Sequence, residues 1–162
     1  MDIPGVKCQA AMGRPGRVLV ARLMPGQDLV EGVKALIESA GFRSGSVTAI
    51  GSLRSASVAW AKKMFLDGDI KNSGVFYDME GPVELGLGVG LFGYSPEGEF
   101  FMHLHGLIQD KEGNMRCGNL LPGSAPALAT VELTVQEIED VDMNYTVDPE
   151  WRHHFPHPVP RG

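Results

Sequence analysis

The sequence predicts an α+β fold built on a largely antiparallel sheet. Most of the chain consists of short runs in which apolar residues alternate with polar residues or glycine, a pattern typical of strands with one buried face. Only residues 28–41 show the three-to-four-residue spacing of an amphipathic helix. The 162 residues contain no internal repeat and no linker, so we expect one domain large enough to bury a hydrophobic core.

The helix has capping signals at both ends. Asp28 can accept hydrogen bonds from the first free backbone N–H groups, and Glu31 three residues later completes a capping box. Gly41 suits the left-handed conformation that commonly ends a helix. The apolar positions between these signals fall on one helical face: Leu29, Val33, Leu36, Ile37 and Ala40. We therefore expect the main helix here.

The predicted strands occupy much of the remaining chain. Signals rich in glycine, proline, aspartate and asparagine separate them, including loops at residues 67–69 and 71–74. Tight turns join three consecutive strands, from residue 84 to residue 121, into an antiparallel meander. The full set is residues 17–23, 46–50, 55–61, 75–79, 84–94, 100–108, 115–121 and 127–138.

The two ends of the chain differ in composition from the central region. Residues 1–16 contain Gly and Pro at several positions and predict an irregular N-terminal arm. Residues 146–162 are rich in proline and histidine and predict a surface tail, docked by Trp151 and Phe155. The main domain is accordingly expected over residues 17–145.

A histidine pair in the predicted strand 100–108 is the clearest candidate site. Side chains two positions apart in a strand point to the same side, about 7 Å apart. His103 and His105 therefore share one face, whereas Leu104 and Ile108 lie on the other, apolar face. Two imidazoles on one face could converge on an ion or a ligand.

The next strand can bring further groups to the histidines. A turn after Ile108 lays residues 115–121 alongside, where Cys117 and Asn119 share one face. Zinc accepts imidazole nitrogen and thiolate ligands, but asparagine is a poor zinc ligand, so the set is incomplete for a standard site. The alternative is a half-buried histidine pair that bonds only to backbone or water, and the spacing leaves both interpretations open.

Residues 84–94 alternate aliphatic residues with glycine. Glu84 and three glycines line one face, and four aliphatic residues line the other. Glycine weakens a strand, so such a row indicates either close packing of another strand or subunit, or space for a ligand. A phosphate-binding loop is a poor alternative, because the glycines are followed by no helix and no Walker lysine.

Charge and cysteine content narrow the classes of function. Lys and Arg number 14 against 20 Asp and Glu, a net charge of −6, and no basic cluster suggests direct binding to DNA. No segment is apolar enough to cross a membrane, and the N-terminus lacks the pattern of a secretion signal. Cys8 and Cys117 indicate free thiols in a reducing compartment, so we expect a cytoplasmic protein.

The order of several motifs resembles the plants and prokaryotes conserved (PPC) domain. The motifs are RVLVARLMPGQDLVEGVKALIESAG, SVTAIGSL, EGPVELGLGVG, HLHGLIQDKEGNMRCGNLLPG and ATVEL. The resemblance covers about residues 17–138 and is to the stand-alone prokaryotic type, without an AT-hook. It implies a mixed sheet of about seven strands with one main helix, assembled as a homotrimer.

The resemblance also implies a metal site and a label of DNA binding. In prokaryotic members the metal site uses an H-x-H pair, matched here by His103 and His105, and a third histidine in a G-G-H-L segment. Asn119 takes that third position here, and Cys117 could supply a thiolate to zinc or another divalent ion. DNA binding is implied mainly through the plant members, but this chain has no AT-hook and no basic stripe.

Two functions follow as hypotheses. The first is a trimeric module that binds a metal ion or small ligand on the His103 and His105 face. The second is the "putative DNA-binding protein" that the family label implies, acting as a non-catalytic, transcription-associated interaction module. Whether the protein is an enzyme stays open: the sequence argues against catalysis, because no Ser-His-Asp or Cys-His constellation is visible in it. In an enzyme version of the first hypothesis a bound ion would polarise a ligand or activate water, and Glu84 or Glu132 could act as a general base only if the fold brings one near the histidines.

Overall fold

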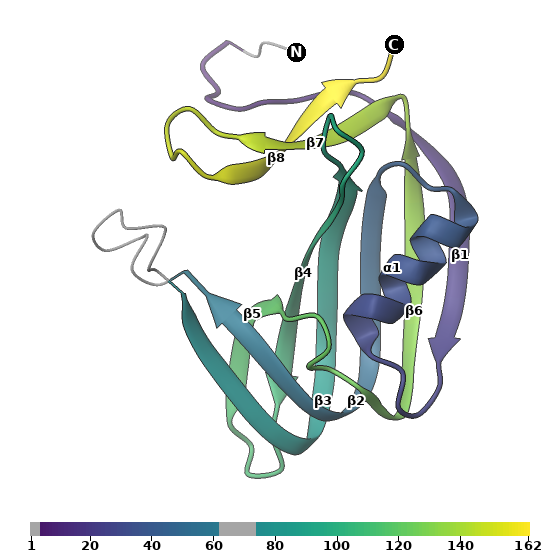
Figure 1. The fold of residues 1–162 in the computed structure, drawn as a ribbon, viewed down its shortest axis with the longest axis vertical. Coiled ribbons are helices and arrows are strands. Elements are labelled where there is room, and N and C mark those ends of the chain that lie inside the picture. The colour runs from purple at the N-terminus through teal and green to yellow at the C-terminus, as the bar shows by residue number, and fades with distance from the viewer. Residues whose placement is uncertain (1–3, 62–73) are drawn as a thin grey trace.

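One helix and eight strands make up the described part of the chain. The computed structural model describes residues 4–61 and 74–162, so the predicted loop at 67–69 and most of that at 71–74 lie outside the described residues. In chain order the elements are β1 (Arg14–Leu23), α1 (Leu29–Ala40), β2 (Gly45–Trp60), β3 (Val75–Tyr94), β4 (Phe100–Gln109), β5 (Met115–Leu120), β6 (Ala127–Glu139), β7 (Val141–Val147) and β8 (His154–Pro160) (Figure 1).

The strands form one mixed sheet in the order β1-β6-β2-β5-β4-β3-β7-β8. All pairings are antiparallel except a short parallel contact between β3 and β7. The long strand β2 pairs with β6, β3 and β5, so the predicted meander β3–β4–β5 folds back onto β2. The α+β class and the mostly antiparallel sheet with one helix are confirmed.

The helix α1 forms where its capping signals place it. Asp28 Oδ1 accepts from the Glu31 backbone N–H at 3.0 Å, and Gly41 ends the helix with a φ of 67°. Leu29, Val33 and Ile37 are completely buried. The helix lies across one face of the sheet (Figure 1), and the main hydrophobic core fills the space between them.

Two pairs of predicted strands are continuous in the structure. The predicted strand 46–50 and all but the last residue of 55–61 belong to β2, and the predicted strands 75–79 and 84–94 belong to β3. The register shifts between Ala49 and Gly51 and again between Leu53 and Ser55, so the strand passes each irregularity without losing its partner. Residues that signal a turn locally therefore form bulges and bends, because long-range pairing with β3 is retained.

The C-terminal segment is a strand, whereas the sequence predicted a surface tail. Residues 154–160 form β8, which pairs with β7 at the edge of the sheet. Pro156, Pro158 and Pro160 alternate along β8, so their missing N–H groups all fall on one edge of the strand. Such an arrangement is tolerated at a sheet edge, where those donors need no partner. Trp151 is substantially exposed and Phe155 half-buried.

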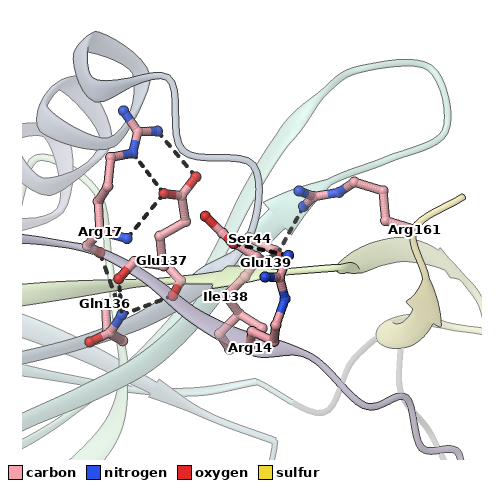
Figure 2. Close-up of polar contacts among 9 residues, drawn as sticks. Arg14, Arg17, Ser44, Gln136, Glu137, Ile138, Glu139 and Arg161 are labelled. Atoms are coloured by element: carbon pink, nitrogen blue, oxygen red, sulfur yellow. Dashed lines mark hydrogen bonds and ion pairs between the residues drawn. The ribbon is translucent and has the colours of Figure 1, made fainter.

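A polar cluster links the start of β1 to the end of β6 and joins Arg161, near the C-terminus, to Ser44 (Figure 2). The Arg17 guanidinium donates to both carboxylate oxygens of Glu137, at 2.8 and 3.1 Å, and Arg14 forms ion pairs with Glu139 and Asp140. Arg161 donates to the Ser44 hydroxyl at 3.3 Å. The strand β1 begins at Arg14, so the last residues of the predicted irregular arm are already paired with β6.

Candidate functional site

The two predicted site histidines face each other on β4. The Nε2 atoms of His103 and His105 lie 2.9 Å apart, and the ring planes meet at 79°. This is hydrogen-bond distance, so one ring carries the proton on Nε2 and the other presents a lone pair. The sequence correctly placed both rings on the face opposite buried Leu104 and Ile108.

The surroundings keep both imidazoles in the neutral form. Desolvation by the surrounding protein lowers the pKa of His103, and the neighbouring His105 lowers it further. Desolvation also lowers the pKa of His105. Because a metal ion binds the neutral imidazole, these directions favour metal binding at neutral pH.

Asn119 completes a group of three polar side chains. It is the direct cross-strand partner of His105, and its side-chain Oδ1 is buried without a hydrogen-bond partner in the described protein. A buried acceptor without a partner costs free energy, and such an atom calls for a donor or a cation. The structure therefore brings His103, His105 and Asn119 onto one patch of the sheet.

Cys117 lies on the same face but farther along β5. Its cross-strand partner is Leu107, and its thiol is free and exposed. Because Cys117 is two residues away from Asn119 along the strand, its thiolate would be displaced from the level of His105 by roughly 7 Å. Asn119 is thus better placed than Cys117 to act with the histidine pair.

Neither carboxylate considered as a general base is beside the histidines. Glu84 pairs with Gln109, and Glu132 pairs with Ile50 and Arg22, whereas His105 pairs with Val89 and Asn119. Among the described residues no group of three His, Cys, Asp or Glu side chains could hold a metal ion. Any ion at this site would therefore depend on two imidazoles and the amide oxygen of Asn119.

This donor set fits a divalent ion only in part. Two Nε2 atoms 2.9 Å apart are suitable ligands for a borderline ion such as zinc, and the Asn119 oxygen is an acceptor without a partner. A divalent ion bound here would replace the proton that the two Nε2 atoms share, so both rings would have to present their Nε2 lone pairs to it. An amide in place of a third imidazole makes the ion more weakly held.

Of the glycines that alternate along β3, Gly90 is required by close packing against another strand of the same chain. A Cβ atom on Gly90 would lie 2.4 Å from the carbonyl oxygen of His103. This distance is too short for a real contact, so a residue with a side chain would not fit at this position without a shift of the backbone. By contrast, Gly86 has space around it, with the nearest atom 3.8 Å from a Cβ. Gly90 therefore lets β3 pack closely beside the histidine strand β4.

A face with many exposed aliphatic side chains surrounds the histidines, and the sequence did not reveal it. Cross-strand pairing aligns one row from Val20 through Thr134, Thr48 and Val89 to His105, and a second from Val18 to Leu91 and His103. We call this surface, which lies on the side of the sheet away from α1, the open face. Its exposed aliphatic residues are Val18, Val20, Ile50, Leu87, Val89, Leu91 and Leu107.

The open face arises from an irregularity in β3 that the sequence conceals. The register shifts between Leu85 and Leu87. As a result Leu85 is completely buried, whereas Leu87 and Val89, which share its parity in the sequence, are exposed. The signal available in the sequence was the row of glycines at the buried positions Gly88 and Gly90.

Comparison with models of known protein families identifies the family to which this chain belongs. The family model of the Plants and Prokaryotes Conserved (PCC, also written PPC) domain matches residues 10–139, most of the chain, so the protein belongs to this family. No curated protein matches the chain significantly. No helix in the described residues is long and apolar enough to cross a membrane.

Solved structures share the fold at low sequence identity. A metal-containing protein from Archaeoglobus fulgidus superposes with a TM-score of 0.78 at 23% identity, covering 92% of this chain and 99% of the other. A plant- and prokaryote-conserved protein from Pyrococcus horikoshii gives 0.75 at 18% identity, covering 94% and 99%. A "putative DNA binding protein" from Bacteroides thetaiotaomicron gives 0.71 at 16% identity, covering 90% and 97%.

Proposed function

We propose that this PPC-domain protein is a homotrimer that binds a divalent metal ion or a small ligand at His103, His105 and Asn119. The observation that carries the proposal is the 2.9 Å approach of the two Nε2 atoms beside the unsatisfied Asn119 oxygen. The metal-containing relative from Archaeoglobus fulgidus adds support. A bound ion would supply an electrophile that polarises a ligand.

Metal content tests this proposal directly. We expect untagged protein incubated with zinc and then desalted to retain about one ion per chain by elemental mass spectrometry, since the site has one set of donors. The double variant His103→Ala/His105→Ala should retain none. The matched control His153→Ala/His154→Ala removes two histidines from the C-terminal segment and should bind as the parent does. Equal metal in all three proteins would show that the site lies elsewhere, and no metal in the parent would refute metal binding.

The weakest of the three proposed ligands, Asn119, can be tested by a further variant. Asn119→His places a third imidazole beside His105 and should tighten zinc binding relative to the parent protein, because imidazole is a better zinc ligand than an amide. A competition titration with a chelating indicator measures the change. Unchanged or weaker binding in a folded variant would mean that Asn119 does not face the ion.

The exposed aliphatic side chains of the open face support self-association. Monomeric proteins seldom expose a contiguous apolar surface of this kind without a partner. Since the resemblance to the PPC family implies three copies, we expect a solution mass three times the 17.5 kDa of one chain, measured by sedimentation equilibrium. A concentration-independent mass of one chain would refute the trimer.

A DNA-associated role is the second candidate, favoured by the descriptions of similar proteins from Bacteroides thetaiotaomicron and Ralstonia eutropha as "putative DNA-binding" proteins. The net charge of −6 favours an interaction module over direct contact with phosphates. Fluorescence anisotropy with labelled duplex DNA at two salt concentrations tests it. Direct binding requires an affinity that falls steeply between 50 and 200 mM salt, and its absence leaves only an indirect role.

A further inference from the structure

The first half of β3 has one edge without a partner strand in the described part of the chain. Residues 75–80 pair with residues 55–60 of β2, whereas β4 pairs with the second half of β3, from Glu84 onwards. Beside this edge lies a cavity of about 370 Å³, bordered by residues 76–80 and by the turn that joins β4 to β5. That turn lies at the end of the molecule opposite β8 (Figure 1). The lining of the cavity shares no residue with the histidine site or with the aliphatic residues of the open face.

The hydrogen bonds of β2 show which backbone groups of β3 point to this edge. Ser57 of β2 directs both of its backbone groups away from β3. Its carbonyl accepts from the Leu121 N–H at 3.1 Å, and its N–H donates to the Ser124 hydroxyl at 3.2 Å. Directly opposite residues of an antiparallel pair exchange both hydrogen bonds or neither. Asp78, which lies opposite Ser57, therefore points its N–H and carbonyl to the outer edge.

The same direction recurs at every second residue, so Phe76, Asp78 and Glu80 all present backbone groups at the outer edge. No described residue bonds to these N–H and carbonyl groups. The edge strand β8 differs, because its three alternating prolines have no N–H to offer a further strand. Residues 75–80 contain no proline. An edge that keeps its donors and acceptors can accept an extended segment as an additional strand.

The side chains along this edge determine which segment suits it. Asp78 and Glu80 are exposed and share one face of β3 with Phe76, which is 63% exposed. The Ser57 hydroxyl donates to Asp78 Oδ1 at 2.6 Å and fixes this carboxylate. Opposite charges on directly facing residues of neighbouring strands stabilise the pair, and like charges destabilise it. The edge therefore favours a strand with lysine or arginine at alternate positions and disfavours a second copy of the same acidic edge.

The two basic residues that line the cavity do not cancel these carboxylates. Lys111 Nζ lies 3.7 Å from the carboxylate of its neighbour Glu112. The Arg116 guanidinium carbon lies 5.2 Å from the centre of the Tyr77 ring, and Tyr77 alternates to the face of β3 opposite Asp78. The acidic face of this edge is therefore available to a cationic partner.

We infer that the outer edge of residues 76–80 binds an extended basic peptide, which joins the sheet as an antiparallel strand with a basic residue opposite Asp78 and another opposite Glu80. Main-chain hydrogen bonds supply the affinity, and the two carboxylates supply the selectivity. This interaction goes beyond the function proposed above and does not depend on a ligand at the histidine pair.

The probe is a fluorescently labelled peptide in which lysine alternates with threonine, titrated with the full chain and followed by fluorescence anisotropy. The same peptide with glutamate in place of lysine should bind roughly 4-fold more weakly or worse, because two charge pairs change sign. In the antiparallel arrangement the lysine N–H groups point to β3 and the threonine N–H groups point away. N-methylation of the lysine amides should therefore abolish binding, whereas N-methylation of the threonine amides should leave it unchanged.

Variants of the edge test the same contacts from the side of the protein. Asp78→Ala removes the carboxylate and keeps the N–H, whereas Asp78→Pro removes both, and proline is tolerated at a strand edge. The proline variant should bind about 2- to 12-fold more weakly than the alanine variant, the usual worth of one hydrogen bond. Glu80→Lys should weaken the lysine peptide roughly 2- to 30-fold and strengthen the glutamate peptide. Glu97→Lys is the matched control, because Glu97 lies in the turn before β4, outside the cavity, and this variant should bind as the parent does.

Hydrogen exchange measured by NMR locates the bound peptide. The amides of Phe76, Asp78 and Glu80 should exchange rapidly in the free protein and slowly with the lysine peptide bound, while those of Tyr77 and Met79 are protected throughout. If the three edge amides are already protected in the free protein at high concentration, a second copy occupies the edge and the inference is overturned.

The other contrary outcomes are equally distinct. No binding of the lysine peptide would overturn the inference outright. Equal binding of the peptide methylated on its lysine amides would reveal attraction of charges without strand pairing, and would also overturn it. Unchanged binding by a folded Glu80→Lys would place the peptide elsewhere on the protein. If Asp78→Pro is unfolded by circular dichroism, Glu80→Lys and the methylated peptides still decide the question.

Discussion

At the residue scale, Glu137 is a carboxylate with only 7% of its surface exposed. The side-chain hydrogen bonds from Arg17 lower the pKa of Glu137, opposing the increase that burial alone would cause. A carboxylate whose pKa is lower in the folded protein contributes stability above its unfolded pKa, near 4.3, and loses that contribution as the pH falls through its folded pKa.

We therefore predict that Glu137→Gln lowers the free energy of unfolding at pH 7, and that the difference from the parent shrinks below about pH 4. Urea unfolding at a series of pH values measures it. Glu97→Gln, which changes an exposed carboxylate in the turn before β4, serves as the control and should show little difference at any pH. A Glu137→Gln deficit that stays constant down to pH 3 would contradict the proposed role of the charge.

At the scale of elements, the spacing between β3 and β4 depends on Gly90. A Cβ atom at Gly90 would come within 2.4 Å of the His103 carbonyl, so the strands can accommodate alanine only by moving apart. Gly90→Ala should destabilise the fold by about 1–3 kcal/mol, the usual cost of overpacking, and disturb the histidine pair.

Gly86→Ala provides a control in the same strand, because the nearest atom would be 3.8 Å from the new Cβ. Its stability should stay close to that of the parent, measured by chemical denaturation. NMR of the imidazole resonances should report a changed His103 and His105 environment in Gly90→Ala alone. Equal stability of the two variants would mean that β3 and β4 are not in this close contact.

At the scale of the whole molecule, the C-terminal hairpin closes a second, smaller core. Phe101, Val141 and Met143 are buried in it, and Tyr145 stacks on Phe101 with ring centroids 4.7 Å apart. The strand β8 pairs with β7 along its entire length. Removing β8 would therefore leave β7 as an unpaired edge over this cluster.

A chain that ends at Asp148 should accordingly unfold at a lower temperature and bind a hydrophobic dye, because the small core loses its support. A chain that ends at Pro160 is the control: it keeps β8 and loses Gly162 and Arg161, with the bonds of Arg161 to Asp140, Asp142, Ser44 and Val141. Differential scanning calorimetry compares them. Identical melting of the shorter chain and the parent would show that β8 is dispensable.

Sequence patterns determined the features that depend on neighbouring residues. The N-cap at Asp28, the C-cap at Gly41 and the shared face of His103 and His105 all follow from contacts or periodicity within a few positions, and each is confirmed. The α+β class follows from the same local periodicities summed along the chain.

Only the tertiary structure decided which distant residues meet. Asn119 lies beside His105, and Gly90 lies against the backbone carbonyl of His103, because of the register between separate strands, which no local pattern specifies. The bulge before Leu87 exposes aliphatic residues that simple alternation would have kept on one face with Leu85, and pairing with β7 makes a strand of a proline-rich segment. Periodicity within a segment is a local property, but register, bulges and edge pairing are decided by the free energy of the whole sheet.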